Sequence, residues 1–256
     1  MFYYYLLIVT IIAMAAGFLT GLLSIGGGLI VFPAYLYIMP LLGFRALSIH
    51  EATGIAATQI IIGSLFSFLS HRENIKLNKK DLVSFGVISG LGAFCGAVLS
   101  VFLPEKLLLL FYFAILVIAI LSMTVLKPSE TKAHVAKNKY IVPFLCYFSS
   151  LMSGSLGLGG AVLYIPTFRY FYGLSTKNCI GLVSFLVFCV AVMSFTGKIL
   201  THQVPYNLLA FIFIGSFVGA KFGAYISKKL SSQVLKRILL FIIVVAAIRV
   251  LISILS

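Results

Sequence analysis

Long apolar runs, interrupted by short polar stretches, cover most of this chain. Near-continuous apolar sequence spans residues 2–44, 52–70, 82–103 and 107–126. A helix needs about 20 apolar residues to cross a bilayer. The pattern therefore predicts an all-α polytopic membrane protein rather than a soluble domain.

Composition supports the same fold class. Hydrophobic residues make up 62% of the chain and charged residues only 9%, whereas a soluble domain is about one quarter charged. The mean hydropathy is +1.17. An ordinary water-exposed surface cannot be built from these residues.

A comparison of the chain with itself finds the same landmarks twice and in the same order. Residues 21–33 align with residues 154–166, and both stretches contain a glycine-rich run followed by an apolar stretch and a proline. Further landmarks recur 127 positions apart: Gly54 and Gly181, Gly92 and Gly219, Ala93 and Ala220, Gly96 and Gly223. Internal repetition of this kind predicts two related halves.

The longest polar stretch, residues 127–140, separates the halves and predicts a cytoplasmic linker. We expect a first transmembrane repeat over residues 1–126 and a second over residues 141–256, together forming one integral membrane domain. About five hydrophobic segments are expected in each half, the second of them short. They cover residues 2–24, 28–42, 52–70, 82–101 and 107–126, then 141–155, 161–172, 180–197, 206–226 and 234–255.

Charge predicts how the segments are oriented. The chain has 19 basic and 5 acidic residues, a balance that also occurs in nucleic-acid-binding proteins, but here the basic residues cluster between apolar runs. If all ten segments cross, alternate connections hold thirteen basic residues on one side and only Arg45, Lys106 and Lys198 on the other. If the short segments only dip into the membrane, the count is eight against nine. The positive-inside rule therefore favours an odd number of crossings per half, an inverted repeat and both termini outside.

Glycine runs interrupt the hydrophobic stretches near their middles. They comprise Gly26, Gly27 and Gly28 in the first half and Gly157, Gly159 and Gly160 in the second. Glycine permits unwound backbone, and a half-helix beginning after such a break directs free amides and a positive dipole end at an anion. Close helix packing is the alternative explanation. For Gly86, Gly90, Gly92, Gly96, Gly215, Gly219 and Gly223, the regular spacing favours packing.

These glycine-broken segments, each followed by an apolar stretch and proline, resemble the TauE/SafE sulfite exporter family over essentially the whole chain. The resemblance implies transport of small sulfur oxyanions or sulfonates, such as sulfite or sulfoacetate, across the cell inner membrane.

Polar side chains beside the breaks complete the candidate substrate site. Those at or just after the breaks are Ser24, Thr53, Thr58, Gln59, Ser155 and Ser184, and Lys221 is an intramembrane cation. A single hydroxyl can instead bond its own helix backbone, and Lys221 can instead extend to the membrane surface. His50 and Glu51 are either solvated at the interface or a proton relay.

The sequence thus predicts a secondary transporter for a small anion, surrounded by membrane lipids. Acidic residues are absent from the predicted site, whereas a cation site would normally contain them. A passive anion channel is the alternative, and an intramembrane enzyme is more remote because no catalytic constellation is visible. We expect no metal, cofactor or nucleic acid; the four cysteines show no ligand spacing and are expected to serve in packing.

Overall fold

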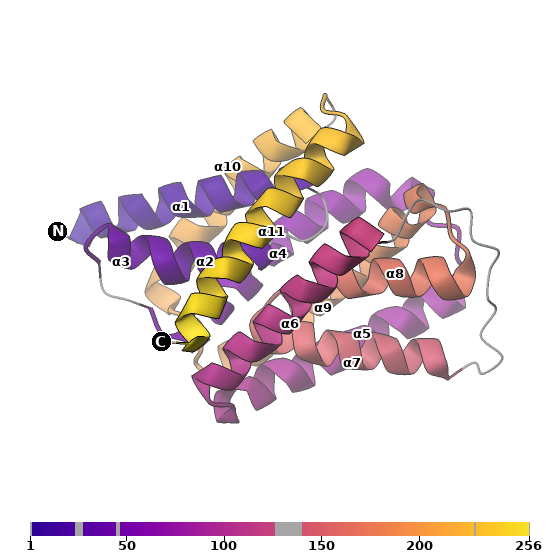
Figure 1. The fold of residues 1–256 in the computed structure, drawn as a ribbon, viewed down its shortest axis with the longest axis horizontal. Coiled ribbons are helices and arrows are strands. Elements are labelled where there is room, and N and C mark those ends of the chain that lie inside the picture. Colours follow the sequence, from indigo (N-terminus) through magenta and orange to yellow (C-terminus); the bar gives the residue numbers. More distant parts are fainter. Residues whose placement is uncertain (1, 24–27, 45–46, 126–139, 228, 256) are drawn as a thin grey trace.

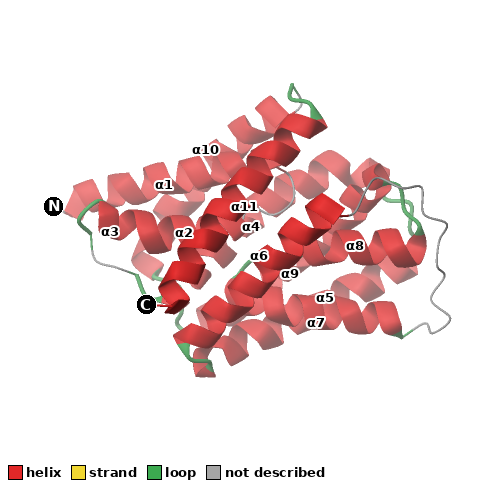
Figure 2. Ribbon diagram, viewed as in Figure 1, coloured by secondary structure: helices red, strands yellow, loops and turns green. Residues whose placement is uncertain are grey.

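The computed structural model describes residues 2–23, 28–44, 47–125, 140–227 and 229–255. Within these ranges the chain is helical, with short connections and no strands (Figure 2). Seven helices are long and apolar enough to cross a membrane. They are α1 (Phe2–Leu23), α4 (Ile49–His71), α5 (Lys79–Leu99), α6 (Glu105–Val125), α9 (Thr176–Leu200), α10 (Leu209–Ser227) and α11 (Ser232–Leu255). The all-α polytopic membrane fold is confirmed.

The remaining predicted segments form shorter helices. The first half contains a continuous helical stretch made of α2 (Gly28–Pro33), the π-helix η1 (Ala34–Ile38) and α3 (Met39–Leu41). Pro33 has no backbone N–H for the helical ladder, which explains why the π-helix follows it directly. In the second half, α7 (Ile141–Leu156) leads to α8 (Ala161–Tyr172). Three 3₁₀ turns, η2 (Arg72–Asn74), η3 (Ser100–Phe102) and η4 (Tyr206–Leu208), lie in connections between the long helices.

The short helices do not each cross the molecule. At about 1.5 Å per residue, the twelve residues of α8 rise roughly 18 Å, which is less than the ~30 Å hydrocarbon core of a bilayer. In Figure 1, α7 and α8 both extend inward from the same end, as do α1 and the α2–α3 stretch from the opposite end. By length alone, α8 is therefore too short to span a bilayer. The α2–α3 stretch and α8 each return toward the end of the molecule from which the preceding helix came. The connections between the long helices therefore alternate between the two ends of the molecule (Figure 1).

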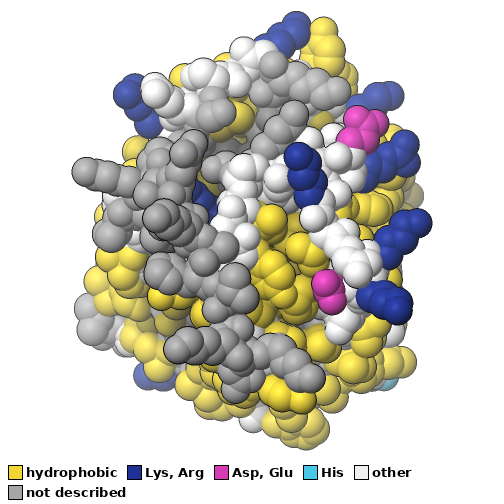
Figure 3. All heavy atoms as spheres, turned by 90° about the vertical axis from the view of Figure 1, so that its right-hand side faces the viewer, with side chains coloured by type: hydrophobic (Ala, Val, Ile, Leu, Met, Phe, Trp, Pro, Cys, Tyr) yellow, Lys and Arg dark blue, Asp and Glu magenta, His cyan; other side chains and the backbone are white. Residues whose placement is uncertain are grey.

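Basic residues gather at the end of the molecule where α4 leads into α5. Arg72, Lys76, Lys79 and Lys80 are all exposed there. Figure 3 views the molecule from this end and shows Lys and Arg side chains along its rim. Both chain termini lie toward the opposite end (Figure 1). This distribution is the one that the positive-inside rule produces when the basic end faces the cytoplasm.

Glycines let two pairs of helices approach closely, as their regular spacing predicted. On α10, Gly219 and Gly223 lie against the backbone of α1, and a Cβ on Gly219 would meet Phe18 N at 2.7 Å. On α5, Gly92 and Gly96 lie against the backbone of α7. Helix α1 of the first half therefore packs against α10 of the second half, and α7 of the second half packs against α5 of the first. The two halves thus contact each other reciprocally.

Candidate functional site

The second glycine break is a helix end followed at once by a helix start. At the end of α7, Leu158 N donates to Ser153 O at 2.9 Å and Gly157 N to Gly154 O at 3.3 Å, the paired bonds of a Schellman motif. Gly157 has φ of 67°, and Gly159 and Gly160 have φ of 77° and 73°. These left-handed conformations favour glycine. They turn the chain so that α8 begins at Ala161, inside the protein.

The first break meets the second. Gly28 begins α2, and a Cβ on it would lie 2.8 Å from Leu158 Cα and 2.9 Å from Gly157 O. The sequence predicted that both breaks belong to one site, and the structure brings these residues together. Ser24, Gly26 and Gly27 lie outside the described residues.

The start of α4 covers the second break. A Cβ on Gly157 would meet Thr53 O at 2.5 Å and Ala57 N at 2.7 Å, so the α4 backbone directly contacts the turn. Gly159 is bordered by Ile60 of α4 and Val187 of α9. The breaks are therefore enclosed by the third helical segment of each half.

The ammonium group of Lys198 lies beside this junction. Lysine side chains usually reach water, but this one is completely buried near the end of the largely apolar helix α9, with 0% of its surface exposed. Four oxygens lie within hydrogen-bond distance of its Nζ: Gln203 Oε1 at 2.6 Å, Ser100 Oγ at 2.8 Å, Ser155 O at 2.8 Å and Thr53 Oγ1 at 2.9 Å. We call these four acceptors the lysine cage. All four are neutral, and three of the predicted residues, Thr53, Ser155 and Gly157, lie in or next to the cage.

Acidic side chains near the start of α4 are engaged with backbone. Glu51 and Ser48 form a capping box, in which Ser48 N donates to Glu51 Oε2 at 2.9 Å and Glu51 N to Ser48 Oγ at 3.1 Å. Glu105 Oε1 accepts from Ile49 N at 3.2 Å. Both carboxylates thus sit at a helix N-terminus, where negative charge is stabilising.

Other predicted polar residues bond locally. Thr58 Oγ1 donates to Gly54 O at 2.9 Å and Ser184 Oγ to Gly181 O at 2.8 Å, each within its own helix. Gln59 Nε2 instead donates to Ala13 O of α1 at 2.7 Å, and its buried Oε1 has no protein partner.

Lys221 is not brought to the breaks. It is exposed on α10, in a stripe with Phe217, Phe222 and Tyr225. Such an apolar outer face is the one a bilayer would cover, so a lysine here extends along lipid. Arg249 on α11 is also exposed.

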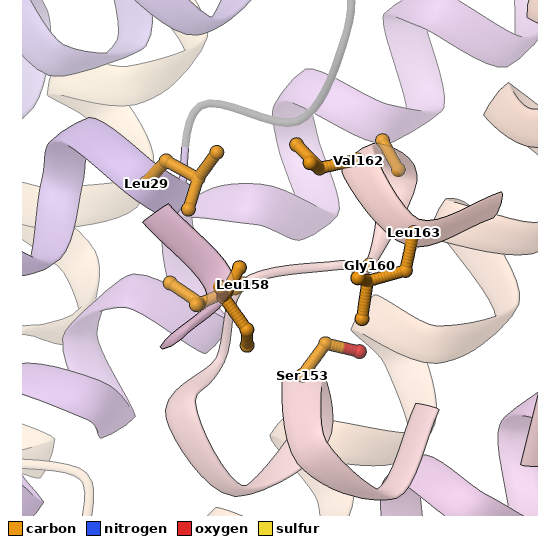
Figure 4. Close-up of a pocket in the computed structure, with 8 residues that line it drawn as sticks. Leu29, Ser153, Leu158, Gly160, Val162 and Leu163 are labelled. Carbon is orange, nitrogen blue, oxygen red and sulfur yellow. The ribbon is translucent and has the colours of Figure 1, made fainter. Parts of the chain in front are cut away.

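A small pocket lies where the two breaks meet. Figure 4 shows Leu29 of α2, Leu158 of the break and Val162 of α8 around it, with the Ser153 hydroxyl beside Gly160. The pocket has room for about one water molecule. A ligand larger than water therefore fits this pocket only if the surrounding segments move.

Comparison with known proteins agrees with this architecture. The family model described as "Sulfite exporter TauE/SafE" matches residues 9–250. The chain belongs to the TauE/SafE family. No solved structure matches the chain.

Curated relatives of this TauE/SafE protein are named as transporters. A "Probable membrane transporter protein" of Xylella fastidiosa is 24% identical over 243 residues, covering 91% of this chain and 90% of the relative. One from Haemophilus influenzae is 25% identical over 261 residues, with 94% and 97% covered. The "Probable membrane transporter protein YdhB" of Bacillus subtilis is 27% identical over 194 residues, with 73% and 79% covered. The chain is therefore a multi-pass membrane transporter with a small-molecule substrate.

Sequence reasoning missed the lysine cage of this TauE/SafE protein. The hydrophobic pattern ended the helix at residue 197, which placed Lys198 at the membrane surface, whereas α9 continues to Leu200. The partners of Lys198 come from α4, from the turn after α5, from α7 and from the connection after α9. No local pattern predicts that convergence. A lysine within an otherwise apolar helix was the only available signal.

Proposed function

We propose that this TauE/SafE protein is a secondary transporter that moves a small anion, a sulfur oxyanion or organosulfonate such as sulfite or sulfoacetate, across the cell inner membrane. The observation that carries the proposal is the meeting of the two glycine breaks, with Gly28 against Gly157 and Leu158. Two helices begin at this junction, and the N-terminal end of a helix carries about half a positive charge.

The candidate site consists of the two breaks and the α4 residues that cover them. It includes Gly28, Gly157, Gly159, Gly160, Thr53 and Ser155 by contact, with Ser24, Gly26 and Gly27 added on sequence grounds. An inverted arrangement of residues 1–126 and 141–256 suits a carrier, because it relates an outward-facing state to an inward-facing one. Reciprocal helix packing between the halves supports this arrangement.

The small size of the pocket beside the breaks supports a carrier over a passive channel. The pocket between them has room for about one water molecule, so an anion occupies it only after the protein changes shape. The flux through a carrier saturates as the substrate concentration rises, and the flux through a secondary transporter depends on the gradient of a coupled ion. The flux through a passive channel rises in proportion to substrate concentration and needs no coupled ion.

Flux into proteoliposomes tests the proposal. Sulfite, thiosulfate, sulfoacetate and taurine are each supplied with and without a proton gradient, and protein-free vesicles serve as the control. We expect saturable flux of at least one of the anions above the control. Flux of none of them, or flux proportional to concentration without saturation, would contradict the proposed carrier.

A further inference from the structure

The charge of Lys198 is hydrogen-bonded but not neutralised. An ammonium has three N–H donors, and the lysine cage offers four acceptors between 2.6 and 2.9 Å. Hydrogen bonding is therefore complete. Each acceptor is a neutral oxygen, however, so none of them supplies a negative charge to balance a protonated lysine.

Burying a charge without a counter-charge is costly. The effective penalty is several kcal/mol per ion even after relaxation, and hydrogen bonds to neutral groups offset only part of it. Neither Glu51 nor Glu105 is among the acceptors of Lys198; their carboxylates accept from the backbone at the start of α4. None of the four contacts of the ammonium brings an acidic side chain of the chain to it.

The lysine cage is joined to the second glycine break. Ser155, whose carbonyl accepts from Lys198, is two residues before Gly157. Thr53 contacts both, since its hydroxyl accepts from Lys198 and its carbonyl lies against Gly157. Movement of the break would therefore remove acceptors from the ammonium and free it for a ligand.

Three side chains of the cage can also donate to an anion. The hydroxyls of Thr53 and Ser100 can rotate, and Gln203 has an amide NH₂, which here donates to Ala97 O at 3.1 Å and Thr201 Oγ1 at 2.7 Å. A cation surrounded by several such donors suits an anion with several oxygens. Charge-assisted bonds to such oxygens are about twice as strong as neutral ones.

We propose that Lys198 is the substrate-binding cation of this transporter, and that the oxygens of a small oxyanion or sulfonate replace the cage acceptors when the second break moves. The inference rests on the proposed function and assigns its charge selectivity to one residue.

Two variants test the proposal by different routes. Lys198→Gln removes the charge, and Gln203→Glu supplies a counter-charge from the chain while keeping the side-chain shape. Both should raise the KM for sulfite or sulfoacetate flux roughly 30-fold or more, the effect of removing one partner from a buried charge pair. Lys198→Arg keeps the charge and should retain more affinity than Lys198→Gln. Arg249→Gln, which removes an exposed intramembrane cation, is the matched control and should behave as wild type.

Thermal unfolding in detergent shows which variants are folded. Gln203→Glu keeps the side-chain shape and places a carboxylate beside the ammonium, but it loses the amide donor to Ala97 O and Thr201 Oγ1, so its Tm is compared with that of wild type before its KM is interpreted. A folded Gln203→Glu protein with wild-type KM would overturn the proposal. So would a Lys198→Gln protein that loses only the response to a proton gradient. If wild-type protein transports none of the anions, the proposed function itself fails, and the two failures are thereby distinguished.

Discussion

Gly154 on α7 lies directly against Ala93 on α5: a Cβ on Gly154 would meet Ala93 Cα at 2.5 Å. The corresponding pair in the rest of the molecule is Gly21 on α1 and Ala220 on α10, where the same construction gives 2.9 Å. In sequence, Gly21 aligns with Gly154 and Ala93 with Ala220. In one contact the glycine comes from the second half and the alanine from the first, and in the other contact the reverse holds. A two-fold axis between the halves would produce this exchange.

This contact predicts that Gly154→Ala destabilises the protein. The backbone of α5 cannot yield as a side chain can, so overpacking should cost about 1–3 kcal/mol. Gly90→Ala on α5 is the control, because its nearest neighbour is the flexible side chain of Met193 at 3.1 Å. There the gain in helix propensity, about 1 kcal/mol, should offset the crowding. Thermal unfolding in detergent measures both, and equal Tm values would contradict the packing explanation.

The hydrophobic pattern predicted the helices well because a bilayer imposes one strong requirement on sequence. All ten expected segments correspond to helices or continuous helical stretches. The packing role of Gly92 and Gly219 was also predictable, since spacing of four on an apolar helix defines one face. The capping box of Ser48 and Glu51 follows a known local pattern, Ser-x-x-Glu, that the sequence displays.

The lysine cage was not predictable in the same way. Its four acceptors belong to residues 53, 100, 155 and 203, so only the packed fold brings them to Lys198. Lys221 looked the better candidate because it lies nearer the middle of an apolar segment. Which face of α10 is turned outward decides its exposure, and an all-round apolar helix gives no periodic signal for that face.

Gly160 should be needed for transport more than for folding. Its φ of 73° and the short approach of a Cβ to Ser153 Oγ, 2.8 Å, make any side chain unfavourable at the break. We expect Gly160→Ala to lose flux by roughly tenfold or more while remaining folded, because strain of about 1–3 kcal/mol falls at the moving segment. Gly27, which lies outside the described residues, is expected to behave alike.

The control for Gly160→Ala is Gly43→Ala. Gly43 has a similar φ of 79°, and a Cβ there would meet nothing within 4 Å. Both variants therefore carry comparable backbone strain, but only Gly160 lies at the break. Proteoliposome flux and detergent Tm are measured together. Full flux in Gly160→Ala, or equal loss in both variants, would leave close packing as the role of the break.

Orientation can be tested by labelling single cysteines. In a background without the four native cysteines, Lys76→Cys and Lys229→Cys should react only with reagent that has access to the cytoplasm, since both are exposed at basic connections. Tyr206→Cys, exposed in the connection before α10, should react from the periplasm. Labelling of either lysine position from outside intact cells would exclude the predicted orientation.

Anions, and not cations, should stabilise the purified protein. A ligand that binds only the folded state raises the unfolding free energy by RT ln(1 + [L]/Kd), about 2.7 kcal/mol at 100 Kd. Lys198 is a basic group with only neutral acceptors next to the breaks, and a cation would have to be buried beside it without a counter-charge, which is costly. A thermal-shift panel compares sulfite, thiosulfate and sulfoacetate with Na⁺, K⁺ and organic cations at matched ionic strength. Stabilisation by the cations and by none of the anions would exclude an anion site.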